Sequence, residues 1–86
     1  MARYRRQSPE KLGGKLRELR LRLGMTQEEL AGHLGTDSGS ISRFEHGKRE
    51  PSLLEILAYS RISGVGVEVL IDDKRSLAKK SRRKEN

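Results

Sequence analysis

The residues best suited to bind a ligand lie in one short basic stretch near the middle of the chain. Lys48 and Arg49 stand between Gly47 and Pro51, and such a connection offers ammonium, guanidinium and backbone N–H groups to an anion. Contact with nucleic-acid phosphates is the chemistry that fits, because Lys, Arg and backbone amides are the usual donors to phosphate oxygens. Glu50 opposes this locally, because its carboxylate has the same sign as a phosphate.

Enzymatic and metal chemistry find little support in the sequence. The chain has no Cys and no phosphate-loop motif, and its two His are His33 and His46. Neither has clustered acids around it, and each has a structural explanation near the end of a predicted helix. His46 precedes a helix-ending Gly, where a positive charge interacts favourably with the helix dipole. We therefore predict no enzyme, no metal site and no cofactor.

Two short helices are predicted immediately before the basic stretch. Thr26 and Glu29 form a capping box for the first, and Gly35 follows its last apolar residue as a helix-ending Gly. Asp37 is the expected N-cap of the second, which Gly47 stops. Such a pair cannot bury its apolar faces alone, but it can place its second helix in the major groove of DNA. On spacing alone, an αα-hairpin inside any small helical bundle is an alternative.

A further helix is predicted before this pair, beginning at Ser8 and Pro9 and ending at Gly24. A Ser cap and a Pro in the first turn are typical of a helix start. The helix should bury a stripe formed by Leu12, Leu16, Leu19 and Leu23. Gly13 and Gly14 either weaken the first turn or admit a close helix neighbour.

A fourth helix should follow the basic stretch. Ser52 and Glu55 form a second capping box, and Gly64 closes the helix. Its core-facing residues are predicted to be Leu53, Ile56, Leu57 and either Tyr59 or Ser60. Residues 65–71 fit a short final helix or turn, although alternating apolar residues there also fit a strand.

The net charge of +7 lies at the ends of the chain. Residues 8–73 hold nine Lys or Arg against eleven Asp or Glu, whereas residues 74–86 hold seven basic residues and one acid. The net charge of the chain therefore does not by itself indicate nucleic-acid binding by residues 8–73, and binding would depend on a local basic face. We predict a flexible basic arm at 1–7, which enters a minor groove or is simply solvated, and a flexible basic tail at 74–86.

Without Cys, a membrane span or a secretory signal, a cytoplasmic protein is expected.

The sequence letters add a resemblance. The stretches MTQEELAGHLG and SISRFEHGKREPS resemble the Cro and phage-repressor helix-turn-helix family, also called the XRE family. The similarity covers about Leu12 to Ile71. It implies an all-α fold, a compact five-helix lambda-repressor-like DNA-binding domain at 8–73 with the helix-turn-helix motif at about 26–45, and it favours a helix at 65–71.

The same resemblance implies roles for individual residues. The start of the second helix, led by Gln27, would meet a phosphate. The third helix would enter the groove with a small, polar set on or near its exposed face: Ser38, Gly39, Ser40, Ser42 and Arg43. The base-reading positions of the family correspond to Ser38, Gly39, Ser42 and Arg43. The family commonly has long amide side chains at the first two, so direct readout should be modest here. Arg43 is the best candidate for reading a guanine, and a phosphate contact is its alternative.

Arg20 and Glu45 match a pair of residues that form an ion pair in several family members. We predict that pair here, fixing the first helix to the end of the third by charge-assisted hydrogen bonds. Two independent surface charges are the alternative.

The function implied is sequence-specific binding of double-stranded DNA by a transcriptional regulator, expected to be a repressor that acts as a homodimer on a palindromic operator. Residues 65–71 are the expected dimer surface. A protein-interaction adaptor with the same fold is the alternative, since residues 8–73 are mildly acidic. The sequence does not tell whether a small-molecule effector binds.

Overall fold

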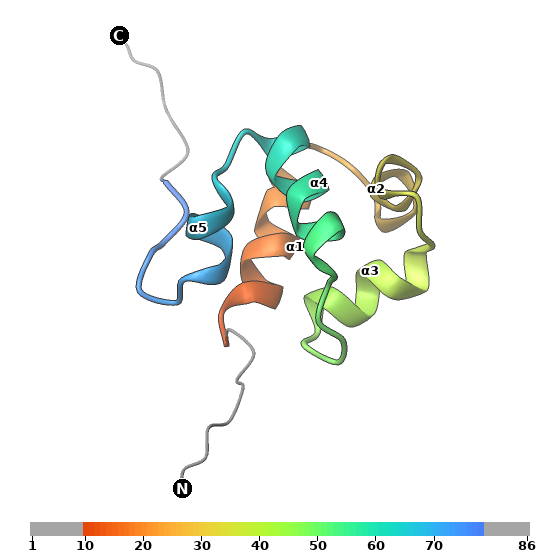
Figure 1. Cartoon of the computed structure of the whole chain (residues 1–86). Helices are drawn as coiled ribbons and strands as arrows, with labels where there is room; N and C mark the ends of the chain where they lie inside the picture. The colour runs from red at the N-terminus through yellow and green to blue at the C-terminus, as the bar shows by residue number, and fades with distance from the viewer. Residues whose placement is uncertain (1–9, 79–86) are drawn as a thin grey trace, which may run out of the picture.

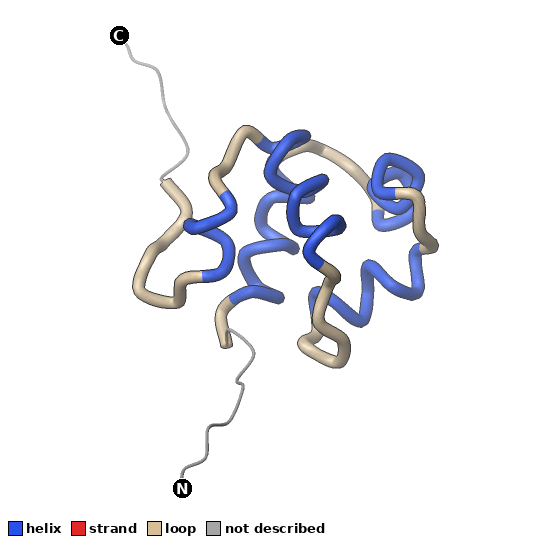
Figure 2. Tube along the Cα trace, in the orientation of Figure 1, coloured by secondary structure: helices blue, strands red, loops and turns tan. Residues whose placement is uncertain are grey.

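The computed structural model describes residues 10–78. The arm at 1–7, Ser8, Pro9 and the last eight residues of the predicted tail lie outside the described residues. Five helices follow one another without a strand in the described part: α1 (Leu12–Arg22), α2 (Gln27–Leu34), α3 (Ser38–Glu45), α4 (Leu53–Ser63) and α5 (Val67–Ile71). Figures 1 and 2 show α1 near the centre, with α5 on one side and the α2–α3 pair on the other. The predicted all-α, five-helix fold is confirmed.

Local capping sets the ends of α2, α3 and α4 where the sequence predicts them. The Glu29 N–H donates to Thr26 Oγ1 at 3.0 Å, and the Thr26 N–H donates to the Glu29 carboxylate at 2.9 Å. The capping box at the start of α4 has the same reciprocal bonds. Gly35 and Gly64 end α2 and α4 with φ angles of +73° and +75°, a left-handed conformation that favours Gly.

The start of α1 differs from the prediction. The helix begins at Leu12 and has no side-chain cap of its own. The carboxylate of Asp73 takes that place, accepting hydrogen bonds from the Glu10 N–H at 2.8 Å and the Lys11 N–H at 3.1 Å. A residue from beyond α5 therefore caps the first helix, which no local pattern near Ser8 indicates.

The core lies where the five helices meet. Its buried apolar residues are Leu12, Leu16, Leu19, Leu30, Ala31, Ile41, Phe44, Ile56, Tyr59 and Leu70. For two residues, the prediction that they lie in the core was wrong. Leu23 is exposed because α1 has ended before it, and Leu53 is 77% exposed because it lies on the first turn of α4, beyond the edge of the core.

Gly13 lets α1 approach the end of α3 closely. A Cβ atom at Gly13 would lie 2.7 Å from the carbonyl oxygen of Glu45 and 2.9 Å from that of Phe44. A Cβ at Gly14 would meet nothing within 4 Å. Of the two explanations offered by the sequence, the close helix neighbour holds for Gly13 alone.

Residues 74–78 pack against α1 instead of extending freely from the domain. Leu77 is partly buried against the core, and Arg22 Nη1 donates to the carbonyl oxygen of Ala78 at 2.7 Å. The buried Lys15 donates from Nζ to the carbonyl oxygens of Val69 at 2.6 Å and Asp72 at 2.9 Å. This part of the predicted flexible tail is therefore attached to the domain.

No helix within residues 10–78 combines the length and the apolar character that crossing a membrane requires.

Candidate nucleic-acid interface

Helix α3 has one buried face and one open face. Ile41, Phe44 and Glu45 are buried at helical spacing and hold the helix against α1 and α2. On the opposite side, Ser38, Gly39, Arg43 and His46 are exposed, and Ser42 is half-buried. Four of the five residues predicted for the groove thus lie on the accessible face.

Ser40 is the exception among them. It is buried, and its Oγ accepts a hydrogen bond from Arg49 Nη1 at 2.9 Å. The reason is helical spacing, because Ser40 lies one turn before Phe44 and shares its inward face. The prediction that Ser40 lies on or near the exposed face was wrong; its hydroxyl holds the loop that follows α3.

Asp37 caps the start of the open face. Its carboxylate accepts the Ser40 N–H at 2.7 Å, and this backbone bond, with a smaller contribution from the Arg43 charge, lowers the pKa of Asp37 below its usual value. The guanidinium of Arg43 lies over Gly39: a Cβ atom added to Gly39 would be 3.5 Å from Arg43 Nη1. The small residue leaves room for the guanidinium along the helix surface.

A buried polar network ties the first helix to both helices of the motif. Arg20 donates from Nε to Glu45 Oε2 at 2.7 Å and from Nη2 to Oε1 at 3.1 Å, so the ion pair is bidentate. The Glu45 side chain is 1% exposed and that of Arg20 11%. Glu45 Oε1 also accepts a bond from Gln27 Nε2 at 3.2 Å, and Arg20 Nη1 donates to the Met25 carbonyl at 3.0 Å. The side-chain bond to Glu45 raises the pKa of Arg20.

This network also fixes the start of α2 relative to the end of α3. It holds the amide of Gln27, the first residue of α2, beside the last residue of α3. Tyr59 packs beneath, and burial raises the pKa of its hydroxyl, with the Glu45 charge acting in the same direction. The Gln27 end of the expected phosphate-facing surface is thus fixed to the end of α3.

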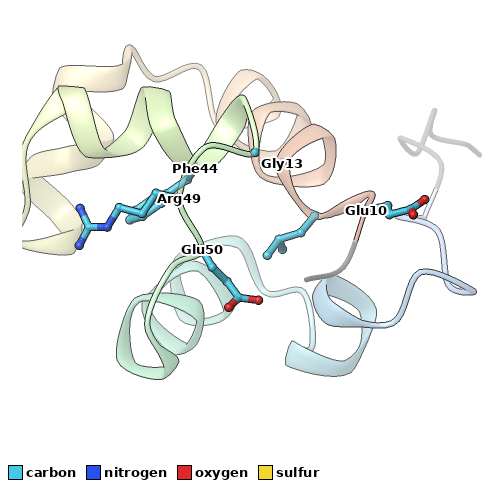
Figure 3. A pocket seen from close by; sticks show the side chains of 7 residues that line it. Glu10, Gly13, Phe44, Arg49 and Glu50 are labelled. Carbon is cyan, nitrogen blue, oxygen red and sulfur yellow. The ribbon is translucent and has the colours of Figure 1, made fainter. Parts of the chain in front are cut away.

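The loop after α3 presents its two basic residues differently. Lys48 is exposed, whereas the guanidinium of Arg49 lies 5.3 Å from the centre of the Phe44 ring and donates to Ser40. Figure 3 shows Arg49 extended alongside Phe44 at the edge of a pocket of about 230 Å³, with Glu10 and Glu50 further along its lining. Those two carboxylates make the pocket itself unsuited to a phosphate.

His46 belongs to the open face, although the sequence interpretation assigned it only to a helix end. It lies three residues after Arg43, four after Ser42 and seven after Gly39, the spacing of one helical face. Its Nδ1 is 2.8 Å from the Ser42 carbonyl oxygen and 3.4 Å from Ser42 Oγ. That spacing was visible in the sequence and is the signal that could have found it.

A short helix pair with a buried inner side and a small, polar outer side defines the helix-turn-helix class. The profile of the helix-turn-helix domain family matches residues 11–72. The chain therefore belongs to the helix-turn-helix family of DNA-binding transcriptional regulators, and the resemblance to the phage-repressor type is confirmed by its structural neighbours.

Two curated proteins are similar in sequence. The propionyl-CoA carboxylase regulator of Cereibacter sphaeroides is 40% identical over 58 residues, a match that covers 67% of this chain and 13% of that regulator. An uncharacterized HTH-type transcriptional regulator of Archaeoglobus fulgidus is 39% identical over 56 residues, 65% of this chain and 80% of the relative.

Several solved structures share the fold. The P22 c2 repressor in complex with a synthetic operator has a TM-score of 0.68 at 26% identity, covering 72% of this chain and 94% of the repressor. The restriction-modification controller protein C.AhdI of Aeromonas hydrophila has a TM-score of 0.64 at 36% identity, with 71% and 92% covered. The hypothetical transcription factor NHTF from Neisseria has a TM-score of 0.63 at 25% identity, with 83% and 88% covered.

Proposed function

We propose that this protein regulates transcription as a repressor that recognises a specific double-stranded DNA sequence by inserting α3 into the major groove. The observation that carries the proposal is the division of α3 into a buried face and an open face of small polar residues with one Arg. A helix held in this way can approach base edges closely at its start, because Ser38 and Gly39 there have small side chains or none.

The open face divides into base-reading and phosphate-binding parts. Ser38 and Ser42 have short hydroxyl side chains, so they contact bases singly or through water. Arg43 is the one long side chain there that can bond two atoms of a guanine. Gln27 at the start of α2, with Lys48 and Arg49 after α3, would contact phosphates and fix the position of the domain without reading sequence.

A homodimer on a palindromic operator completes the proposal. One α3 reaches few base pairs, and two domains related by a two-fold axis would place their α3 helices in half-sites about 34 Å apart. The expected dimer surface at 65–71 is partly committed to the core, because Val65 and Val67 pack against it. Next to it lies a groove of about 210 Å³ lined by residues that include Leu12, Leu53 and Ile71. We assign this groove and the exposed Leu54 to a second copy of the chain.

The test is to select bound duplexes from a random pool and then to measure the affinity of the wild type and of Arg43→Ala for the selected site and its single-base variants. We expect Arg43→Ala to lose about 1 to 3 kcal/mol at one G·C pair and to discriminate less there. A uniform loss over all variants would assign Arg43 to a phosphate. The absence of any preferred sequence for the wild type would contradict specific recognition.

A protein-interaction adaptor remains the second candidate, because residues 8–73 carry more acidic than basic side chains. Salt distinguishes the two functions. A DNA-binding protein loses affinity for a duplex steeply as salt rises, since counterions are released from the phosphates. Failure to bind any duplex at low ionic strength would favour the adaptor.

A further inference from the structure

His46 occupies the end of the open face of α3 in a defined orientation. Its Nδ1 lies 2.8 Å from the carbonyl oxygen of Ser42, one turn earlier in the helix. A carbonyl oxygen only accepts hydrogen bonds, so Nδ1 carries the proton in this contact and donates it. The same carbonyl oxygen also accepts the backbone N–H of His46 at 3.0 Å, so the ring adds a second hydrogen bond at the end of the helix.

This contact leaves Nε2 as the atom that changes with pH. With Nδ1 protonated, the neutral ring has a lone pair on Nε2, and the charged ring has a second N–H there. The residue is exposed, so Nε2 is open to a partner outside the domain. A lone pair repels a phosphate oxygen, whereas an N–H on a charged ring donates to it.

The surroundings of His46 contain both signs of charge. Glu45 is turned inward and already accepts bonds from Arg20 and Gln27. Gly13 brings the first half of α1 against the end of α3. The other charged side chains on α3 and in the loop after it are Arg43, Lys48, Arg49 and Glu50. Those on or just before α1 are Glu10, Lys11, Lys15, Arg17, Glu18, Arg20 and Arg22, and α2, which also packs on α3, carries Glu28, Glu29 and His33.

We propose that His46 contacts a DNA phosphate through Nε2 at the end of α3, and that protonation of its ring strengthens DNA binding. The proposal rests on the proposed DNA-binding function and adds a residue and a dependence on pH to it. In the bound state the ring takes one proton from the solvent, keeps Nδ1–H on the Ser42 carbonyl and gives Nε2–H to a phosphate oxygen. Binding and proton uptake are therefore linked.

The experiment measures the affinity of the full chain for a 30-base-pair duplex of random sequence at pH 6 and pH 8, each at several salt concentrations. A random duplex suffices because a phosphate contact needs no particular base. We expect the wild type to bind roughly fivefold more tightly at pH 6, with a salt slope steeper by about 0.9, the value for one additional phosphate contact.

Two matched variants locate the effect. His46→Asn keeps an N–H that can cap the Ser42 carbonyl but cannot titrate, so its affinity and salt slope should be the same at both pH values. His33→Asn removes the other His, which is exposed in the last turn of α2, and should behave like the wild type. Circular dichroism at both pH values shows whether each variant is folded.

The outcomes separate this inference from the function on which it rests. Wild-type binding whose dependence on pH survives in His46→Asn would overturn the inference and leave DNA binding intact, as would loss of the dependence in His33→Asn. A neutral ring protonated on Nε2, read from the ¹⁵N shifts of His46 in the free protein, would also overturn it. No binding of the duplex by any of the proteins at either pH would instead overturn the DNA-binding function itself.

Discussion

Gly13 and Gly14 are neighbours in α1 with opposite surroundings, and two substitutions make use of the difference. Gly14→Ala places a methyl group in open space. Because Ala loses less conformational entropy than Gly when the chain folds into a helix, this substitution should stabilise the protein by about 0.5 to 1 kcal/mol. Gly13→Ala places the same methyl group against the carbonyl oxygens of Glu45 and Phe44, so α1 and α3 must move apart. We expect a loss of about 1 to 3 kcal/mol.

Urea unfolding of the two variants checks this pair. Each is the control for the other, because they share the residue change, the helix and the intrinsic propensity. Stabilisation by both substitutions would mean that α1 and α3 are not held in close contact, and the packing of the motif on α1 would then need another explanation.

Arg20 and Arg22 offer a second pair at this scale. Arg20→Ala removes both Arg bonds from a carboxylate that is 1% exposed, leaving Gln27 as its remaining side-chain donor in the described residues. This should cost about 3 kcal/mol or more, because an unpaired buried charge is expensive. Arg22→Ala breaks a pair with Glu18, which is 51% exposed, and an exposed bond to the Ala78 carbonyl, and should cost about 1 kcal/mol or less. Equal melting temperatures would contradict the structural role of Arg20.

Single residues were predicted well from the sequence where local spacing decides their position. Ile41 and Phe44 were placed on the inner face of α3, and both are buried. Ser40 was misplaced because its small polar side chain suggests a surface, while its partner Arg49 lies nine residues on and beyond the end of the helix. The ion pair of Arg20 and Glu45 spans 25 residues, and only the family resemblance pointed to it.

At the scale of the elements, α1 depends on a cap from the other end of the domain. Asp73 accepts the N–H groups of Lys11 and Glu10, and these backbone bonds lower the pKa of Asp73 below its usual 3.8. A carboxylate with a lowered pKa in the folded state contributes stability above pH 3.8, and the contribution is lost as the pH falls through the folded-state value. Asp37 at the start of α3 acts in the same direction.

Asp73→Ala should therefore lower the urea midpoint at pH 7, and the effect should become smaller between pH 3.8 and pH 2.5 as the carboxylate of the wild type takes up its proton. The measurement is urea unfolding of both proteins at several pH values between these limits. A difference between the two midpoints that is independent of pH would contradict the cap. Amide exchange at the start of α1 should be faster in the variant at pH 7, since α1 would lose its cap.

The elements also differ in how far the sequence specified them. Helices α2 and α4 contain both residues of their capping boxes, Thr26 with Glu29 and Ser52 with Glu55, so a short window was sufficient. The start of α1 was predicted wrongly because Asp73 lies 63 residues from Glu10 in the chain. For α5 the local pattern was ambiguous between helix and strand, and the family resemblance favoured the helix. The structure has a helix there, with Leu70 fully buried in an element that contacts α1 and α4.

At the scale of the whole molecule, the distribution of charge and apolar surface limits how the domain can meet DNA and a second copy. Within the described residues, the open polar face lies on α3, whereas Leu53 and Leu54 are exposed at the start of α4. DNA contact and self-association can therefore use separate surfaces, which a dimer on two half-sites requires.

Leu54 is the residue with which to test that separation. It is 75% exposed in the first turn of α4 and follows Leu53, which lines the groove assigned to the second copy. Leu54→Glu should therefore leave the fold intact and weaken a dimer, because it brings a charge into an apolar interface. Leu21→Glu is the matched control, since Leu21 is 49% exposed on α1 outside that groove. Sedimentation velocity with and without a selected operator measures the mass of each protein.

We expect the wild type and Leu21→Glu to form dimers on the operator and Leu54→Glu to be a monomer that binds a half-site weakly. The weakening should exceed any direct effect at the DNA, because Leu54 is not on the open face of α3 and its loss acts through the second domain. Dimers of all three proteins would show that another surface joins the two copies. A wild type that is monomeric both free and on DNA would contradict the homodimer, while leaving α3 as the groove-binding element.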